Sequence, residues 1–190
     1  MAFKLILALA IKNGLKTTDV FNQYVDIATL GTIADVVPLL GENRVIVDKG
    51  LKILHNPKRI GIRAIMEVAG VLDKPLSAST IAFSIAPRLN AAGRLGSAAT
   101  AVELLLTNDE SRARELALLL DTENKERQQT ERQIFDEALE LIAKDSNFEK
   151  KKVIVLAQEN WHQGVIGIVA SRLCDIYYKP CILISHTNGV

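Results

Sequence analysis

Two arginines and an asparagine are concentrated in one short run, residues 85–98, whose other members are mostly small or apolar. The polar side chains are Arg88, Asn90 and Arg94. A guanidinium group donates hydrogen bonds in a planar fork that matches the oxygens of a phosphate. Beside a helix start, where backbone N–H groups are free, such forks are typical of an anion site. The run therefore indicates a phosphate site, and the alternative is an interhelical turn whose arginines pair with nearby carboxylates.

The same run contains residues that usually interrupt a helix. Pro87 has no backbone N–H group and cannot donate within a helix. Gly93 and Gly96 can adopt positive φ angles and allow another backbone or a ligand to approach. Ser97 is a plausible N-cap for the apolar segment that follows. We therefore expect a break between helices here rather than a continuous helix.

A single carboxylate, Asp35, lies among apolar neighbours in the run of residues 31–38. A buried carboxylate needs a charged partner or a metal ion, because its desolvation is costly. The pattern thus makes Asp35 a candidate metal ligand. The alternative is that Asp35 caps the turn before Pro38.

The composition limits the class of protein. The chain has 190 residues, 48% of them hydrophobic and 5% aromatic, so Leu, Ile, Val and Ala must build the core. Its formal net charge of +1 gives no global attraction to nucleic acid, so any such site must be local. The two cysteines, Cys174 and Cys181, lack metal-type spacing and suit a reducing, cytoplasmic setting. Neither a signal peptide nor a membrane-spanning segment is expected.

The first 107 residues predict a cluster of short helices with short connections. The expected helices are 3–11, 18–28, 43–54, 60–71, 79–86 and 98–106. The first is apolar nearly all round, which predicts a buried helix. Because a core helix then starts so abruptly, we expect that a preceding piece of the protein is missing.

A long helix is expected from Thr107 or Asn108, either of which can cap it, to about Ala143. Its two ends are apolar, whereas residues 121–132 contain no large apolar side chain. A helix segment that is polar all round is typical of a solvated bridge between two bodies. The alternative, a disordered linker, is disfavoured because the segment contains neither Pro nor Gly.

The last part of the chain predicts a β-α-β unit. Residues 151–157 and 181–184 are apolar strands that flank a loop at 161–164 and a helix at 165–178. A continuous apolar strand is typical of a buried parallel sheet. We therefore predict an α/β protein whose second domain is incomplete, because one such unit cannot bury a sheet alone.

Three runs together, residues 31–39, 87–96 and 161–172, resemble in order and spacing the RecJ single-strand-specific DNA exonucleases of bacteria, within the DHH phosphoesterase superfamily. The resemblance covers essentially the whole chain. It implies the C-terminal part of a catalytic DHH domain (1–107), a connecting helix (108–147) and the N-terminal part of a DHHA1 domain (148–190). It further implies 5′-to-3′ digestion of single-stranded DNA, in repair and recombination, between the two domains.

The resemblance also implies roles for individual residues. The family uses two Mn²⁺ or Mg²⁺ ions, and of their ligands Asp35 alone carries over, since the chain has no Asp-His-His run. Arg94 is expected to clamp a phosphate, and Arg88 to contact phosphate or brace the loop. Asn90 is expected at the same phosphate site, where it either orients Arg94 or bonds to the backbone. His162, just before a helix, is expected to contact phosphate; alternatively it caps that helix or packs on Trp161, itself expected in the core.

Two other functions remain open from the sequence. The first is a DHH phosphodiesterase that acts on small nucleotides. The second is a non-catalytic scaffold of the same superfamily that binds nucleic acid. The long connecting helix and the run of residues 87–96 favour the exonuclease.

Overall fold

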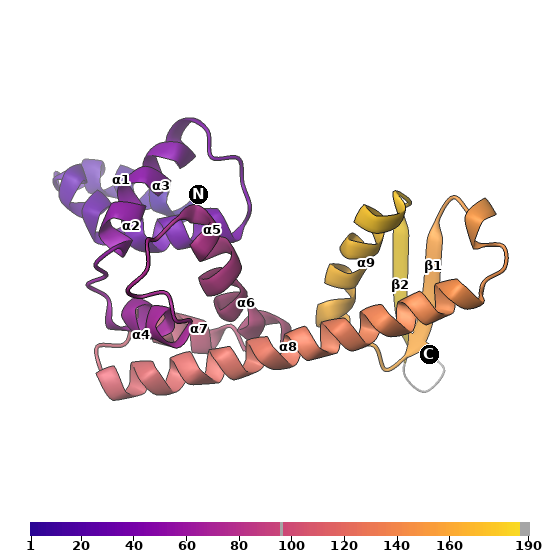
Figure 1. Cartoon of the computed structure of the whole chain (residues 1–190). Helices are drawn as coiled ribbons and strands as arrows, with labels where there is room; N and C mark the ends of the chain where they lie inside the picture. Colours follow the sequence, from indigo (N-terminus) through magenta and orange to yellow (C-terminus); the bar gives the residue numbers. More distant parts are fainter. Residues whose placement is uncertain (96, 187–190) are drawn as a thin grey trace.

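The computed structural model describes residues 1–95 and 97–186. A helical body comes first, a single long helix passes beneath it, and a small α/β body lies on the other half of that helix (Figure 1). The α/β class, largely helical with a small parallel sheet, is as predicted. Within the described residues, no helix is both long and apolar enough to cross a membrane.

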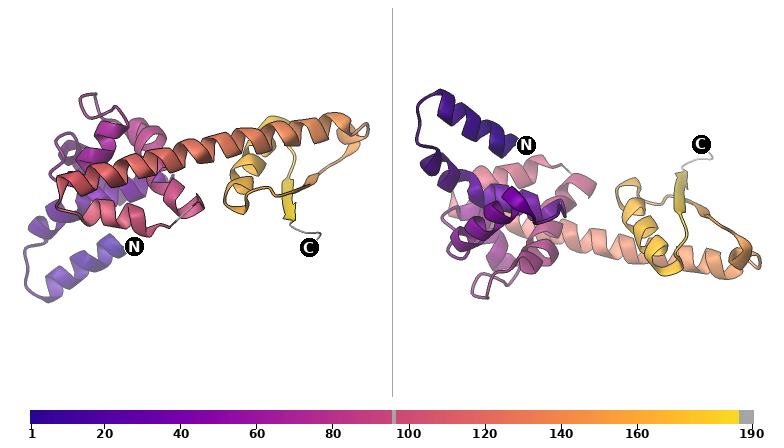
Figure 2. Two further views of the ribbon diagram at one scale, coloured as in Figure 1. Left: turned by 90° about the horizontal axis from the view of Figure 1, so that it is seen from below. Right: turned by 90° about the horizontal axis from the view of Figure 1, so that it is seen from above.

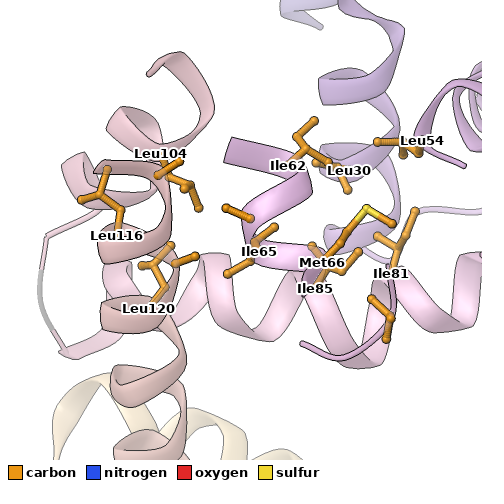
Figure 3. Packing of buried hydrophobic residues seen from close by; sticks show 14 of the residues in the cluster. Leu30, Leu54, Ile62, Ile65, Met66, Ile81, Ile85, Leu104, Leu116 and Leu120 are labelled. Atoms are coloured by element: carbon orange, nitrogen blue, oxygen red, sulfur yellow. The ribbon is translucent and has the colours of Figure 1, made fainter. Parts of the chain in front are cut away.

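The helical body is built from short helices and one π-helical turn. Its elements are α1 (Ala2–Lys12), α2 (Thr17–Ala34), α3 (Gly41–Leu54), α4 (Ile60–Val68), α5 (Ala78–Thr80), the π-helical turn η1 (Ile81–Ile85), α6 (Ala86–Leu95) and α7 (Ala99–Leu106). The apolar side chains of these elements other than α1 meet in one core, to which the long helix contributes Leu116 and Leu120 (Figure 3). The predicted cluster and its aliphatic core are confirmed.

The expected burial of the first helix is wrong. On α1, Leu5 and Ile11 are 62% and 68% exposed, whereas Ala10 is buried. The helix lies at the periphery of the body in both views of Figure 2 and packs mainly along α2, where the Phe3 and Phe21 rings are 5.3 Å apart. Lys4 of α1 also pairs with Glu42 of α3. These neighbours cover one face of α1 and leave the other face exposed.

The long helix α8 (Glu110–Lys144) has 35 residues, which corresponds to about 50 Å. Asp109 caps it by accepting a 3.1 Å hydrogen bond from the Arg112 N–H, so the cap lies just after the two predicted residues. The first turns of α8 enter the core of the helical body. The last turns, including Phe135 and Ile142, enter the core of the α/β body. The predicted strut is thus present as one continuous helix.

The middle of α8 is more buried than its polar sequence suggests. Asp121 and Asn124 are 7% and 2% exposed, which contradicts the expectation of a fully solvated segment. Arg127 pairs with Glu131 at 2.8 Å, and both side chains are mostly buried. Ion pairs and hydrogen bonds offset most of the cost of burying these polar groups. Within the described residues, Glu123 Oε2 and Arg127 Nε are buried without a hydrogen-bond partner.

The α/β body follows a short 3-10 turn, η2 (Phe148–Lys150). It contains β1 (Ile154–Glu159), α9 (Gln163–Tyr177) and β2 (Cys181–His186). The strands pair in parallel, with Ile154 opposite Cys181, so the predicted β-α-β unit is confirmed. The expectation that the strands are buried is wrong for one face, since Val155 and Ile182 are 55% and 54% exposed. Side chains alternate across a sheet, and α9 covers the other face.

Candidate functional site

The predicted break between helices is found at the end of the run, where α6 ends at Leu95 and α7 begins at Ala99, but the break expected at Pro87 is wrong. The chain turns continuously from α5 through η1 into α6, and Pro87 is the second residue of α6. In η1 the Ala86 N–H bonds to the Ile81 carbonyl, five residues back, so the hydrogen-bond pattern has already shifted where the proline enters. Gly93 lies within α6 and is not among the residues with positive φ. Gly96 falls outside the described residues, and the Ser97 hydroxyl accepts from the Ala99 N–H at 3.3 Å.

Arg88 is engaged inside the protein. Its Nε donates to Oδ1 of Asp121 on α8 at 2.8 Å, and the two side chains are 18% and 10% exposed. Its Nη1 donates to the Ser84 carbonyl in η1. This geometry supports the bracing role expected for Arg88 and leaves less of the guanidinium for a phosphate. It also matches the alternative in which an arginine of this run pairs with a carboxylate.

Asp121 is the centre of this ion-pair network. Its other carboxylate oxygen pairs with Lys125 at 2.7 Å. Burial alone would raise the pKa of the Asp121 carboxyl, but the hydrogen bond from Lys125 and the charges of Arg88 and Lys125 outweigh it, so the pKa is lowered. The network fixes the start of α6 onto the middle of α8. Sequence analysis missed Asp121 as a partner, because the two residues are 33 positions apart.

Arg94 and His162 meet at the junction between the two bodies. Arg94 Nη1 donates to the Gly164 carbonyl at 3.1 Å. His162 Nδ1 accepts from the Gly164 N–H at 3.1 Å, so His162 is the N-cap of α9. Both side chains are exposed. The structure thus brings together two predicted phosphate ligands that are far apart in the chain, and His162 adopts the capping geometry that was its alternative.

Asp35 and Asn90 are exposed. Asp35 is the C-cap residue of α2 rather than a carboxylate buried among apolar residues. The expected burial is wrong because α2 ends here and Val36, with φ of 53° and 85% exposure, turns the chain outward. Among the described residues, no ion pair or side-chain hydrogen bond engages the Asp35 carboxylate or the Asn90 amide. The helix that carries Asp35 packs on α6, which carries Asn90 and Arg94.

The residues present do not complete a metal centre. Nowhere in residues 1–95 and 97–186 do three or more His, Cys, Asp or Glu side chains gather closely enough to hold an ion. Hard divalent ions take six or more oxygen ligands, or fewer together with several waters. Asp35 can supply one such ligand. The described donor set therefore does not fit a two-ion site by itself, and no chemical step is assigned to one.

The remaining residues of the 161–172 run have structural roles. Trp161 is 4% exposed and donates from its indole nitrogen to Glu137 of α8 at 2.7 Å, so its predicted place in the core is confirmed. The Ser171 hydroxyl bonds to the Gly167 carbonyl at 3.2 Å. The Arg172 guanidinium lies 3.9 Å from the centre of the Phe135 ring. The Trp161 and Arg172 contacts attach the α9 region to α8, whereas the Ser171 hydrogen bond lies within α9. The start of α9 is the part that faces Arg94.

No protein-family model matches the chain. The comparison with curated proteins finds the single-stranded-DNA-specific exonuclease RecJ of Haemophilus influenzae, 43% identical over 99% of this chain and 34% of that protein. Among solved structures, RecJ of Thermus thermophilus in complex with Mg²⁺ matches with a TM-score of 0.85 and 40% identity, over 97% of this chain and 28% of that chain. An exonuclease RecJ bound to manganese matches with a TM-score of 0.83 and 38% identity, over 97% of this chain and 45% of that one.

The chain spans between 20% and 34% of the length of the curated relatives that it matches. It is thus similar to part of these proteins over almost all of its own length. The similarity includes the helical body, the long helix and the α/β body together, because the structural match covers 97% of the chain. The relatives' names describe whole proteins, of which this chain corresponds to a minor portion.

Proposed function

We propose that this chain, which is homologous to part of the RecJ exonucleases, supplies one wall of a site for single-stranded DNA and the phosphate contacts at the junction of two bodies. The observation that carries the proposal is the meeting of Arg94 and His162 across Gly164. Both are exposed side chains that can donate to an anion. The whole protein would then be a metal-dependent exonuclease that hydrolyses phosphodiester bonds from a 5′ end.

The proposal assigns the parts of the chain as follows. Residues 1–107 belong to the catalytic DHH domain, residues 108–147 to the connecting helix and residues 148–190 to the DHHA1 domain. Asp35 would contribute one ligand to a Mn²⁺ or Mg²⁺ ion, and side chains from elsewhere in the whole protein would supply the others. Asn90, exposed on α6, would contact the DNA backbone near Arg94. Both cysteines are free, which suits the cytoplasm.

Of the alternative functions, neither has a specific observation in its favour. The relatives' printed name specifies single-stranded DNA rather than a small nucleotide. A non-catalytic scaffold remains distinguishable by experiment, because it would bind DNA without contributing to hydrolysis when the rest of a RecJ protein is supplied.

The isolated chain of 190 residues is expected to show no nuclease activity even with Mn²⁺. The described residues supply Asp35 but no group of three metal-ligating side chains, whereas two-ion hydrolysis needs several. The measurement is release of 5′-labelled mononucleotides from a single-stranded oligonucleotide, with a full-length RecJ relative as positive control. If the purified chain digests the oligonucleotide efficiently and keeps that activity on further purification, the proposal that other parts of the whole protein supply the remaining metal ligands is contradicted.

Replacing Arg94 with alanine is expected to weaken binding of single-stranded DNA about tenfold at low salt. Removal of one phosphate contact should also reduce the slope of log K against log salt by about 0.7 for a single strand. Fluorescence anisotropy of a labelled oligonucleotide, titrated at several salt concentrations, measures both quantities. Arg114→Ala is the matched control, because Arg114 is an exposed arginine on α8. Equal affinities for the two variants would remove Arg94 from this role.

A further inference from the structure

The two bodies touch at a point that is braced from both sides by α8. On one side, Arg88 attaches α6 to α8 through Asp121. On the other, Trp161 attaches the loop before α9 to α8 through Glu137, at 2.7 Å. The two helices α6 and α9 rise from the same side of α8 (Figure 1). The helices α6 and α9 thus form two arms on α8 as a common base. The C-terminal turn of α6 contacts the N-terminal turn of α9.

Gly164 is the residue at which the arms meet. Its carbonyl accepts from Arg94 Nη1 at 3.1 Å, and its N–H is held by His162 Nδ1 at 3.1 Å. A Cβ atom added at Gly164 would lie 2.4 Å from the Arg94 carbonyl oxygen and 3.2 Å from its carbonyl carbon. The backbones of α6 and α9 therefore approach so closely that only a residue without a side chain fits.

The atom that meets this Cβ belongs to backbone rather than to a movable side chain. Relief would need the two helix ends to separate by about 1 Å, because ordinary carbon–oxygen contacts begin near 3.4 Å. The braces at Asp121 and Glu137 hold both arms on α8, so separation must occur at the junction. Packed elements respond to such a clash by shifting as bodies rather than by compressing.

We propose that Gly164 is a positioning residue that sets the spacing between the helical body and the α/β body. Through this spacing it holds Arg94 and His162 close enough to contact the same strand of a nucleic acid. The use of the spacing for DNA rests on the function proposed above. The spacing itself follows from the backbone contact and does not require that function.

The experiment compares Gly164→Ala with Gly167→Ala. Gly167 lies on the same helix, and a Cβ there meets nothing within 4 Å in the described structure. Spin labels at Lys49→Cys on α3 and Asp175→Cys on α9, both exposed positions, report the distance between the bodies by pulsed electron resonance. The background carries Cys174→Ser and Cys181→Ser, since both native thiols are free.

Without DNA, Gly164→Ala is expected to lengthen or broaden the distance distribution, whereas Gly167→Ala leaves it unchanged. Arg94→Ala, which removes the hydrogen bond without adding volume, is expected to broaden it less. This second variant also keeps the test decisive if Gly164→Ala does not fold by circular dichroism. Unchanged distributions for every folded junction variant would overturn the proposal.

The effect on DNA binding is measured separately from the distance between the bodies. Gly164→Ala is expected to weaken single-stranded DNA binding about fivefold relative to Gly167→Ala, because one phosphate contact of the pair is displaced. If the unsubstituted chain binds no DNA, the proposed function fails and the distance measurement still decides the role of Gly164. If the distances change but the affinity does not, the spacing is set at Gly164 but does not serve DNA, which overturns that half of the proposal.

Discussion

Replacing Gly61 with alanine is expected to destabilise the helical body by about 3 kcal/mol. Gly61 is buried in α4 where that helix crosses α7. An added Cβ would lie 1.7 Å from the Leu104 carbonyl oxygen and 2.6 Å from its carbonyl carbon. No rotation of a side chain relieves this overlap, because the colliding atoms are backbone. The two helices must therefore move apart and open the core around Leu104, which is fully buried.

The measurement is urea denaturation followed by circular dichroism at about 222 nm, the helical band. Gly31→Ala is the matched control, because Gly31 is also a helical glycine, in α2, but its Cβ would meet nothing within 4 Å in the described structure. That variant should be stabilised by about 0.5–1 kcal/mol, since alanine favours the helix over glycine. Opposite signs for the two substitutions are the expected result. A stable Gly61→Ala protein with an unchanged midpoint would show that α4 and α7 are not in backbone contact.

Replacing Asp121 with alanine is expected to cost about 3 kcal/mol of stability at neutral pH. The change leaves the Arg88 guanidinium, whose side chain is 18% exposed, without its carboxylate. An unpaired charge in such a place is costly because desolvation is no longer offset. Lys125→Ala should cost less than about 1 kcal/mol, because that ammonium group is exposed. Asp136→Ala, which removes an exposed aspartate from the same helix, should change stability by no more than about 0.5 kcal/mol.

The cost at Asp121 should depend on pH. The folded-state pKa of Asp121 is lowered, so its contribution is fully present above the unfolded carboxyl pKa of about 3.9. That contribution is lost as the pH falls through the folded pKa. Denaturation curves from about pH 7 to about pH 3 should therefore show that the free energies of unfolding of the unsubstituted protein and of Asp121→Ala converge below about pH 4. A difference that stays constant over this range would mean that the network contributes through packing rather than charge.

Periodic patterns made much of this architecture predictable from the sequence. The long helix followed from a stretch that lacks both proline and glycine between apolar ends. The β-α-β unit followed from two short apolar runs around a helical one. Trp161 was expected in the core because a large aromatic residue gains more from burial than from exposure, and it is buried.

The errors arose where tertiary context decides. Pro87 was expected to break the helix, but a shift to i+5 hydrogen bonds in the preceding turn allows it near the start of α6. Asp35 was expected among buried neighbours, yet it lies at a helix end, which hydrophobicity alone does not reveal. The roles of Gly164 and Asp121 depend on partners 70 and 33 positions away. The local sequence pattern around a residue does not reveal contacts with residues so far away in the chain.

The unbroken course of α8 between the two cores has a consequence for changes in chain length. An α-helix advances about 100° and 1.5 Å per residue. One residue inserted between Asp121 and Ile134 would therefore turn the α/β body by roughly a quarter of a revolution about the helix axis. An insertion of two full turns would restore the angle but shift that body by about 10 Å. Neither change leaves Gly164 against Arg94, so this segment should tolerate no insertion or deletion.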